Sequence, residues 1–415
     1  MKKFDVIVVG AGPAGMMAAI AAAEAGAKTA LIDKNKRVGK KLLLTGGGRC
    51  NVTNSAPVDE ILANVPGNGR FLHSAFSQFD NQDIIHFFKS RGVALKEEDH
   101  GRIFPVSNRS TTIVDALFSR LVELGVSYFP ETAMHAILHE KGAILGVKTQ
   151  ENTFLAPAVV LTTGGKTYSK TGSTGDGYRF AESVGHTITR LYPTESALIS
   201  SEIFITNRTL QGISLRDVRV TTLDARGKAA ATHTHDLLFT HVGLSGPAAL
   251  RSSSTVNQLL HAGAASVTLL LDLFPELSAA ALETRILQLL SASNKSVKNA
   301  LSALSQERLL LFYLAQADIS GDSKTLSSRQ ISQLAQLFKA LSIRVSGTAP
   351  LEKSFVTGGG VSLKEINPKT LESKLASGLY FAGELLDING YTGGYNVTCA
   401  FVTGHVAGTH AAKGY

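Results

Sequence analysis

The residues of this 415-residue chain that are best suited to chemistry begin near its amino terminus, where glycines follow a short apolar segment. Residues 10–15 read GAGPAG, and Asp33 ends the next apolar segment about 20 residues further on. In this pattern Gly10 permits a tight turn, Gly12 lets a pyrophosphate approach the backbone, and Gly15 lets a helix pack on a sheet. The helix would present its first N–H groups to the phosphates, and Asp33 would accept hydrogen bonds from a ribose. The expected dinucleotide contacts are Gly10, Gly12, Pro13, Ala14, Gly15, Asp33 and the adjacent Lys34.

A second glycine-rich run, LTGGGRCN at residues 44–51, has the composition of a loop that holds a flat ligand. Its three consecutive glycines leave the backbone open to close approach, and Arg49 could face a phosphate or a flavin carbonyl. Taken alone, the run could equally be a flexible loop. Cys50 is a candidate proton donor to a substrate carbon, because a thiol pKa of about 8.5 suits that role; the alternative is a small buried apolar residue. The predicted flavin contacts here are Lys41, Gly46, Gly47, Gly48, Arg49, Cys50 and Asn51.

Two further glycine pairs follow apolar segments and extend the predicted site. TTGG at residues 162–165 ends a strand-like run, and near the carboxyl end GE at 383–384 and GGYN at 393–396 lead into an apolar helix. A helix that begins near Tyr395 would direct its positive end at a flavin and stabilise negative charge there. No second GxGxxG is present, so we expect one resident FAD, with NADPH or NADH docking transiently as electron donor. The remaining predicted cofactor contacts are Ala133, on a strand expected to pass the adenine, and Thr163, Gly164, Gly165, Gly383, Glu384, Gly394, Tyr395 and Asn396.

Polar residues in other loops are candidates for the substrate side of the site. They could contact substrate or hold their own loops in place, and Tyr391 could stack on a base or on the flavin. The pair His233 and His235 would share one face of a strand, but further ligands are lacking, so no metal site is predicted. The substrate-side candidates are His100, Arg102, His241 and Tyr391.

The elements that must position these motifs read as an α/β protein with an insertion. Phe4–Val9 and Thr29–Ile32 have the pattern of buried parallel strands around an alanine-rich helix, and residues 153–163 read as strand before TTGG. After about residue 192, short apolar stretches indicate a small antiparallel sheet or barrel; helical periodicity follows, with a stripe that ends at Leu341. We therefore predict a discontinuous Rossmann-type FAD-binding domain, like that of glutathione reductase, with an inserted small β-barrel domain and a helical subdomain. The predicted segments are 1–191 and 352–415 for the FAD domain, 192–277 with a return strand at 343–351 for the β domain, and 278–342 for the helical subdomain.

Composition narrows the class of protein further. With 44% hydrophobic and 18% charged residues, the chain is an ordinary globular sequence, too long for a single domain on ordinary priors. Its two cysteines, Cys50 and Cys399, exclude a disulfide scaffold and a multi-cysteine metal site, and Cys399 is expected in the core. The first residues lack a signal-peptide pattern, and the apolar run at 16–23 is too short to span a bilayer, so we expect no membrane segment and a cytoplasmic protein. The oligomeric state is not predicted.

The longer motifs carry a resemblance to a known family. They are KKL at 40–42 continuing to Asn54, PGNGRF at 66–71, DHGR at 99–102, GSTGDGY at 172–178, LFTHVGLSGPAAL at 238–250, and the stretch 355–396. With these motifs the chain resembles the bacterial flavoprotein family described as BaiN-like, aminoacetone-oxidase-like or RdsA-type (ribosomal RNA dihydrouridine synthase), and is most similar to Gram-positive members. The resemblance spans nearly the whole chain; the stretch 278–342 is its least distinctive part. It implies an FAD cofactor and a β-barrel plus helical insertion in the FAD domain.

Three functions follow from the resemblance and stay open at this point. We favour reduction of a uridine of 23S ribosomal RNA to dihydrouridine, with hydride passing from reduced FAD to C6 of the uracil and a proton reaching C5. The formal net charge of +8 and the excess of 8 Lys or Arg over 4 acids in residues 278–345 favour an RNA partner, although such a charge excess is also typical of a solvated helical face. The alternative is a small-molecule oxidase or reductase acting on an amine or enone. A non-catalytic, flavin-containing RNA-binding factor is the least favoured of the three.

Overall fold

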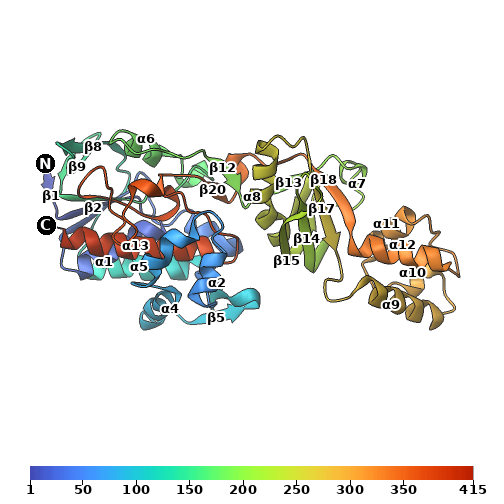
Figure 1. The fold of residues 1–415 in the computed structure, drawn as a ribbon. Helices are drawn as coiled ribbons and strands as arrows, with labels where there is room; N and C mark the ends of the chain where they lie inside the picture. Colours follow the sequence, from blue (N-terminus) through green and yellow to red (C-terminus); the bar gives the residue numbers. More distant parts are fainter. Residues whose placement is uncertain (415) are drawn as a thin grey trace. The chain divides into compact units, whose positions relative to one another are not determined.

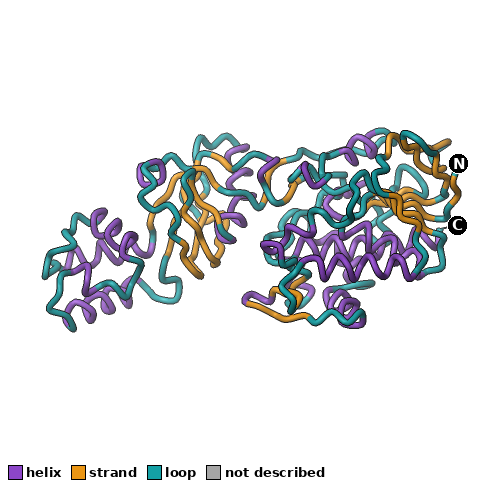
Figure 2. Tube along the Cα trace, turned by 180° about the vertical axis from the view of Figure 1, so that it is seen from behind, coloured by secondary structure: helices purple, strands orange, loops and turns teal. Residues whose placement is uncertain are grey.

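The computed structural model describes residues 1–414, which divide into two compact units. The first unit joins both ends of the chain, residues 1–192 and 351–414, and the inserted unit is Pro193–Pro350. The amino and carboxyl ends lie close together at one side of the first unit (Figures 1 and 2). No helix among the described residues is long and apolar enough to cross a membrane.

A five-stranded parallel sheet in the order β21-β11-β2-β3-β7 forms the centre of the first unit. Its central strands read VIVV, TALI and AVVL and are buried at every residue, as expected for a sheet covered on both faces. Because β21 comes from the end of the chain and lies beside β11, the carboxyl-terminal segment completes the sheet. The strands are β2 (Val6–Val9), β3 (Thr29–Ile32), β7 (Ser127–Phe129), β11 (Ala158–Leu161) and β21 (Leu379–Phe381).

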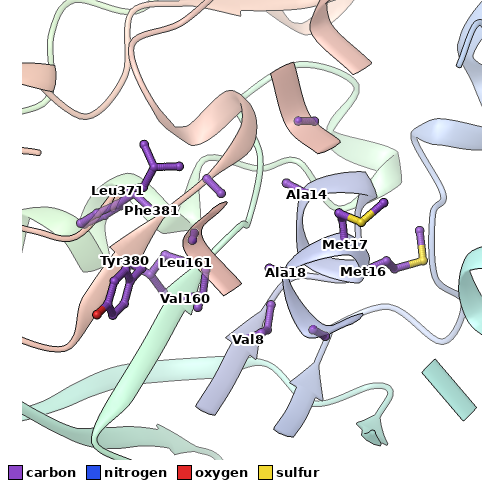
Figure 3. Packing of buried hydrophobic residues seen from close by; sticks show 14 of the residues in the cluster. Val8, Ala14, Met16, Met17, Ala18, Val160, Leu161, Leu371, Tyr380 and Phe381 are labelled. Atoms are coloured by element: carbon purple, nitrogen blue, oxygen red, sulfur yellow. The ribbon is translucent and has the colours of Figure 1, made fainter. Parts of the chain in front are cut away.

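Two long helices pack closely on this sheet, α1 (Pro13–Glu24) and α13 (Tyr395–Lys413). Glycines make the close approach possible: a Cβ at Gly404 would lie 2.3 Å from the Ala14 carbonyl oxygen, and one at Gly408 2.1 Å from that of Ala18. Buried side chains of α1 belong to the same hydrophobic core as Val8 of β2 and Val160 and Leu161 of β11 (Figure 3). The last helix of the chain therefore fixes the first one, which carries the GAGPAG turn at its amino terminus.

Smaller sheets and several short helices complete the first unit. The expected strand at 153–163 is two strands, because the chain breaks at Ala156-Pro157: β10 joins a four-stranded sheet (β1-β10-β9-β8) and β11 joins the parallel one. A hairpin of β5 and β6 with β4 forms a three-stranded sheet. The remaining elements are β1 (Lys2–Lys3), β4 (Thr53–Asn54), α2 (Val58–Ala63), α3 (His73–Phe76), α4 (Asn81–Ser90), β5 (Leu95–Glu98), β6 (Arg102–Pro105), α5 (Ser110–Glu123), β8 (Met134–Glu140), β9 (Ala143–Thr149), β10 (Thr153–Leu155), α6 (Asp176–Glu182), β12 (Tyr192–Thr194) and β20 (Val356–Gly358).

The inserted unit contains a closed antiparallel sheet, as the fold class predicts. The strand order is β18-β17-β14-β15-β16-β13-β19, and the two outer strands are parts of one chain segment separated only by Ser346. The first part of this segment pairs with β17 and the second with β13, which closes the sheet into a barrel. The elements are β13 (Leu198–Ile199), α7 (Ile203–Thr206), β14 (Ser214–Leu223), β15 (Ala229–Phe239), β16 (Gly243–Ser245), α8 (Pro247–His261), β17 (Val267–Asp272), β18 (Leu341–Val345) and β19 (Gly347–Thr348).

A small helical bundle continues from the barrel and shares its hydrophobic core. It consists of α9 (Ala279–Ser291), α10 (Val297–Ala300), α11 (Glu307–Gln316) and α12 (Ser328–Lys339). Ile331 and Leu334 face the core as the helical stripe predicts, whereas Leu341 begins strand β18 and is not helical. The prediction that Leu341 is helical is wrong, because helix α12 ends at Lys339. A buried leucine at this position fits the alternating pattern of a strand equally well.

Candidate functional site

The GAGPAG turn has the geometry that a dinucleotide pyrophosphate requires. A Cβ at Gly15 would lie 1.7 Å from the Gly10 carbonyl oxygen, so only glycine lets the helix start this close to the turn. At Gly12, in contrast, an added Cβ would meet no atom within 4 Å. The open side of Gly12 lies at the amino terminus of α1, where backbone N–H groups and the helix dipole favour phosphate. The turn therefore fits a bound pyrophosphate.

Asp33 is buried beside this turn and holds it in place. Its Oδ2 accepts a hydrogen bond of 2.5 Å from the Ala11 N–H, and its Oδ1 accepts one of 2.6 Å from the Asn35 N–H. Thr132 N–H donates to the Asp33 carbonyl, which places the next residue, Ala133, at the same edge of the sheet. Sequence analysis predicted a ribose contact for Asp33 but not its bond to the turn. The ribose contact stays a prediction, and so does an adenine contact from Ala133.

The second glycine loop leaves backbone open on one side. Gly46, Gly47 and Gly48 all have left-handed φ values of 57°, 67° and 87°. A Cβ at Gly46 would collide with the Phe104 ring, whereas Cβ atoms at Gly47 and Gly48 would meet nothing within 4 Å. The loop is thus packed against β6 on one side and accessible on the other. This is the shape of backbone that a flat ring system such as a flavin can approach closely.

Arg49 faces protein groups in this arrangement. Its Nη1 lies 2.9 Å from Glu98 Oε1, and its guanidinium lies 4.1 Å from the centre of the Phe104 ring. Hydrogen bonds from Lys96 and Arg49 lower the pKa of Glu98, so this carboxylate is charged at neutral pH. Arg49 therefore links the glycine loop to the β5–β6 hairpin, and its contact with FAD stays a prediction.

Cys50 lies in the hydrophobic core of the first unit with no exposed surface. Burial raises the pKa of its thiol to about 12, although a hydrogen bond with Thr45 lowers it. The expectation of a pKa near its ordinary value was wrong, because the sequence does not reveal how deeply the residue is buried. A group that touches flavin or substrate needs accessible surface in a ligand-free protein. We therefore assign Cys50 to packing, the alternative that the sequence left open.

The amino terminus of α13 is tied to the second glycine loop by asparagines. The Asn51 side chain, with its amide oriented to satisfy both neighbours, donates to the Thr53 carbonyl at 2.9 Å and accepts from the Gly394 N–H at 2.9 Å. Asn54 donates to the carbonyls of His100 and Gly393, at 2.9 and 3.0 Å. Residues of the two ends of the chain thus meet at one place, as predicted for a flavin site. Asn396 instead stabilises its own loop through two hydrogen bonds with Gly390, and Tyr395 is buried.

A polar cluster joins four separate segments next to the second glycine loop. Lys41 Nζ lies 2.7 Å from Glu384 Oε2 and 2.7 Å from Thr167 Oγ1. Glu384 Oε1 accepts from the Thr357 N–H at 2.9 Å. Of these residues, Lys41 and Glu384 were predicted as cofactor contacts, whereas Thr167 and Thr357 were missed. Their only signal in the sequence is their position near the glycine runs at 164–165 and 358–360.

The other predicted cofactor residues lie around these groups. Thr163 follows strand β11 beside the GAGPAG turn, and its buried hydroxyl has no hydrogen-bond partner. Gly164 and Gly383 adopt left-handed backbone, and a Cβ at Gly383 would lie 2.9 Å from that of Ala14. Lys34 forms an ion pair of 2.6 Å with Asp176. The structure thus brings residues 10–15, 33–34, 163–165 and 383–384 to the carboxyl edge of the parallel sheet, where ligands of such folds bind.

The substrate-side candidates come from three different segments of the chain. His100 is exposed, with a left-handed φ of 57°, in the turn of the β5–β6 hairpin, and Arg102 pairs with Asp99 in the same turn. Tyr391 is half-buried, and its N–H donates to the Asn64 carbonyl. His241 belongs to the inserted unit, where it lies between β15 and β16. Among the described residues no group of three or more His, Cys, Asp or Glu could hold a metal ion.

The fold and the site together define a class of protein. A parallel sheet whose first turn is GAGPAG, a helix that starts at this turn, and an open glycine loop completed by the far end of the chain are the features of Rossmann-type FAD-binding oxidoreductases. The empty sides of Gly12, Gly47 and Gly48 fit the pyrophosphate and ring system of such a cofactor.

The chain belongs to the HI0933-like family. The model of the HI0933-like protein Rossmann domain matches residues 4–410. The chain is 31% identical over 410 residues to the ribosomal RNA dihydrouridine synthase of Escherichia coli K12, covering 97% of this chain and 96% of that one. It is 30% identical over 419 residues to the 3-dehydro-bile acid delta(4,6)-reductase of Clostridium scindens, covering 98% of each chain. The family predicted from the motifs is confirmed.

Solved structures confirm the fold class. The 3-ketosteroid delta1-dehydrogenase of Sterolibacterium denitrificans superposes with a TM-score of 0.55 over 100% of both chains, at 13% sequence identity. At this identity the likeness concerns the fold alone. It covers the inserted unit as well as the sheet, so the α/β architecture with an insertion is shared by both chains.

Proposed function

We propose that this FAD oxidoreductase reduces a uridine of 23S ribosomal RNA to dihydrouridine. The observation that carries the proposal is the end-to-end match to a chain named ribosomal RNA dihydrouridine synthase, with 96% of that chain covered. Reduced FAD supplies the hydride that adds to C6 of uracil, while a proton adds to C5, so that the C5–C6 double bond becomes single. Because the base must reach the ring system, it has to leave its stack in the RNA.

The reactions for which the two relatives are named support a common type of reaction. Uracil has a C–C double bond conjugated to a carbonyl, and a 3-dehydro, delta(4,6) bile acid also has double bonds conjugated to a carbonyl. We propose reduction of such a bond as the reaction class. A small-molecule enone reductase is therefore the second candidate, favoured by the 30% identity to the bile acid reductase.

The chain's own residues have defined tasks in this proposal. The turn at Gly12 and the amino terminus of α1 would hold the pyrophosphate, and the open backbone of Gly47 and Gly48 would accommodate the ring system. The pair Lys41 and Glu384 fixes the glycine loop to the end of strand β21. The proton for C5 is assigned to a group other than Cys50, because that thiol is buried.

The excess of Lys and Arg over acids in residues 278–345 is weaker support for RNA binding than the residue count alone indicates. Lys298 pairs with Glu307, Lys339 with Asp272, and Arg344 with Glu202. Three of the eight cations counted in residues 278–345 are therefore already neutralised by protein carboxylates. We infer that phosphate contacts come at least as much from the first unit.

We further propose that NADPH or NADH reduces the flavin by transient docking, and that the protein acts in the cytoplasm. The single GxGxxG supports the first point, since a resident nicotinamide nucleotide would need a site of its own. Stopped-flow mixing of the FAD-loaded protein with each nucleotide under anaerobic conditions should give saturable bleaching of the flavin. If neither nucleotide bleaches the flavin, the proposal that NADPH or NADH is the electron donor is refuted.

The function is tested by offering the reduced protein two substrates without oxygen. One is an unmodified 23S ribosomal RNA transcript, and the other is a steroid 4,6-dien-3-one. The proposal predicts rapid flavin reoxidation by the RNA and a uridine that gains two hydrogen atoms at one site, seen by mass spectrometry of nuclease fragments. Reoxidation by the steroid alone would instead assign the chain to the second candidate. A Gly12→Ala variant, in which FAD binding is expected to be weakened, serves as the matched control.

A further inference from the structure

An aromatic pair is presented on the surface of the first unit. The Phe355 side chain is 51% exposed, and its ring centre lies 5.7 Å from that of Tyr168, with an angle of 35° between the rings. Tyr168 has a left-handed φ of 52°, which is unfavourable for an aromatic residue and requires support from the surrounding structure. We call Phe355 and Tyr168 the aromatic platform.

Hydrogen bonds hold the platform rigidly beside the predicted flavin site. The Thr171 N–H donates to the Tyr168 carbonyl at 2.8 Å, and the Lys166 N–H donates to Thr357 Oγ1 at 2.8 Å. Thr167 Oγ1 lies 3.4 Å from the Phe355 carbonyl, and it also accepts from Lys41. The platform is therefore one residue away from the cluster that contains Lys41 and Glu384.

Several cations lie on the chain segments that carry or adjoin the platform. Asn35 donates to the Thr171 carbonyl at 3.2 Å, and Lys40 Nζ lies 3.4 Å from the Lys170 carbonyl, so the segment 34–41 packs against the turn that carries Tyr168. Segments 34–41, 166–176 and 352–355 contain two acids, Asp176 and Glu352. Their cations are Lys34, Lys36, Arg37, Lys40, Lys41, Lys166, Lys170 and Lys353. Lys34 is paired with Asp176 and Lys41 with Glu384, so six of these eight cations have no ion pair described above.

We propose that the aromatic platform and its lysines bind single-stranded RNA next to the target uridine. An unpaired base stacks on Phe355, and the neighbouring phosphates lie near Lys166, Lys170 and the segment 34–41. Stacking accepts any base because every base has a π face, and the cations attract the backbone without reading sequence. A uridine that has left its stack leaves its neighbours available for such contacts. The proposal rests on the proposed function, since it names how that substrate is held.

Phe355 is tested in the oxidised, FAD-loaded full chain with a fluorescent 12-nucleotide, uridine-rich RNA. Phe355→Ala should weaken binding at least about fivefold, Phe355→Tyr should restore it, and the FAD content should stay unchanged in both. The matched control is Val122→Ala, which removes a 63% exposed apolar side chain from α5 and should bind as the parent does. Equal affinities of the parent and Phe355→Ala would overturn the proposal.

The lysines are tested by the salt dependence of the same binding. For single-stranded RNA each lost phosphate contact lowers the slope of log K against log salt by about 0.7, so Lys166→Ala with Lys170→Ala should lower it by about 1.4. Lys89→Ala with Lys148→Ala, two exposed lysines on α4 and β9, should leave it unchanged. An equal fall in both double variants would overturn the proposal, and so would binding to phosphatidylserine vesicles with none to RNA.

The RNA-binding role of the aromatic platform and the proposed function can be refuted separately. If the parent makes dihydrouridine and Phe355→Ala has the same KM for RNA, the platform is wrong and the function stands. If RNA binding depends on Phe355 but no dihydrouridine forms, the platform stands and the function is wrong.

Discussion

A comparison of the variants Gly12→Ala and Gly15→Ala distinguishes an effect on folding from an effect on cofactor binding within one turn. At Gly12 the φ is −80° and an added Cβ meets no protein atom within 4 Å, so alanine fits the ligand-free fold. Replacing glycine at such a position stabilises a protein by about 0.4–1 kcal/mol, because the unfolded chain loses freedom. At Gly15 the Cβ would lie 1.7 Å from the Gly10 carbonyl oxygen and 2.5 Å from Thr162 Oγ1. Helix α1 would have to shift, at a cost of about 1–3 kcal/mol or more.

The two variants should therefore differ in stability although both bind FAD more weakly. A methyl group at Gly12 occupies the side on which the pyrophosphate is expected, and overpacking of about 1–3 kcal/mol corresponds to a Kd for FAD raised about 5- to 150-fold. The assays are urea unfolding of the apoprotein and titration with FAD followed by flavin fluorescence. Gly12→Ala with normal stability and weakened FAD binding is the expected result. Parent-like FAD affinity in Gly12→Ala would refute the placement of the pyrophosphate, and unfolding of this variant would refute the turn geometry.

Three other predictions concern the groups around the site. Cys50→Ala should keep parental flavin reduction and RNA turnover in stopped-flow assays and lose about 1 kcal/mol of stability, whereas a large drop in turnover at full FAD content would restore Cys50 as proton donor. Lys41→Met and Glu384→Gln should each destabilise the first unit, and a double-mutant cycle from urea unfolding should give a coupling of about 1 kcal/mol; additive effects would mean that the 2.7 Å contact contributes nothing. Burial lowers the pKa of His186, despite its contact with Glu365. The unfolded chain therefore takes up this proton first, so stability should fall as pH drops below about 6.5, by up to about 1.4 kcal/mol per pH unit. His186→Asn should lose that part of the slope, and an identical pH profile for the variant would contradict the assignment.

The parts of the site that depend on local spacing could be predicted from the sequence. The turn at residues 10–15, its strand and its helix are encoded within about 30 residues, since each glycine there has a distinct steric task. The insertion could be predicted as well, because alternating short apolar stretches and helical periodicity differ visibly in the chain. The closure of the barrel could not be predicted. One segment pairs with β17 before Ser346 and with β13 after it, and no pattern in the sequence specifies these two partners.

The contacts that sequence analysis missed come from distant partners. Arg49 meets Glu98 across 49 residues, and Lys41 meets Glu384 across 343. Cys50 has the same neighbours in sequence whether it is exposed or buried, and only its packing raises its pKa. Glycine motifs thus locate a ligand, whereas the partners of the charged side chains around it are decided by tertiary structure.

The central claim is tested most directly by mapping dihydrouridine in cells. The 23S ribosomal RNA of a strain without this chain is compared with the RNA of the same strain complemented with the parent or with Gly12→Ala. The account predicts one dihydrouridine that is missing in the deletion strain, restored by the parent and not restored by Gly12→Ala at equal protein level. The same dihydrouridine content in all three strains would contradict it.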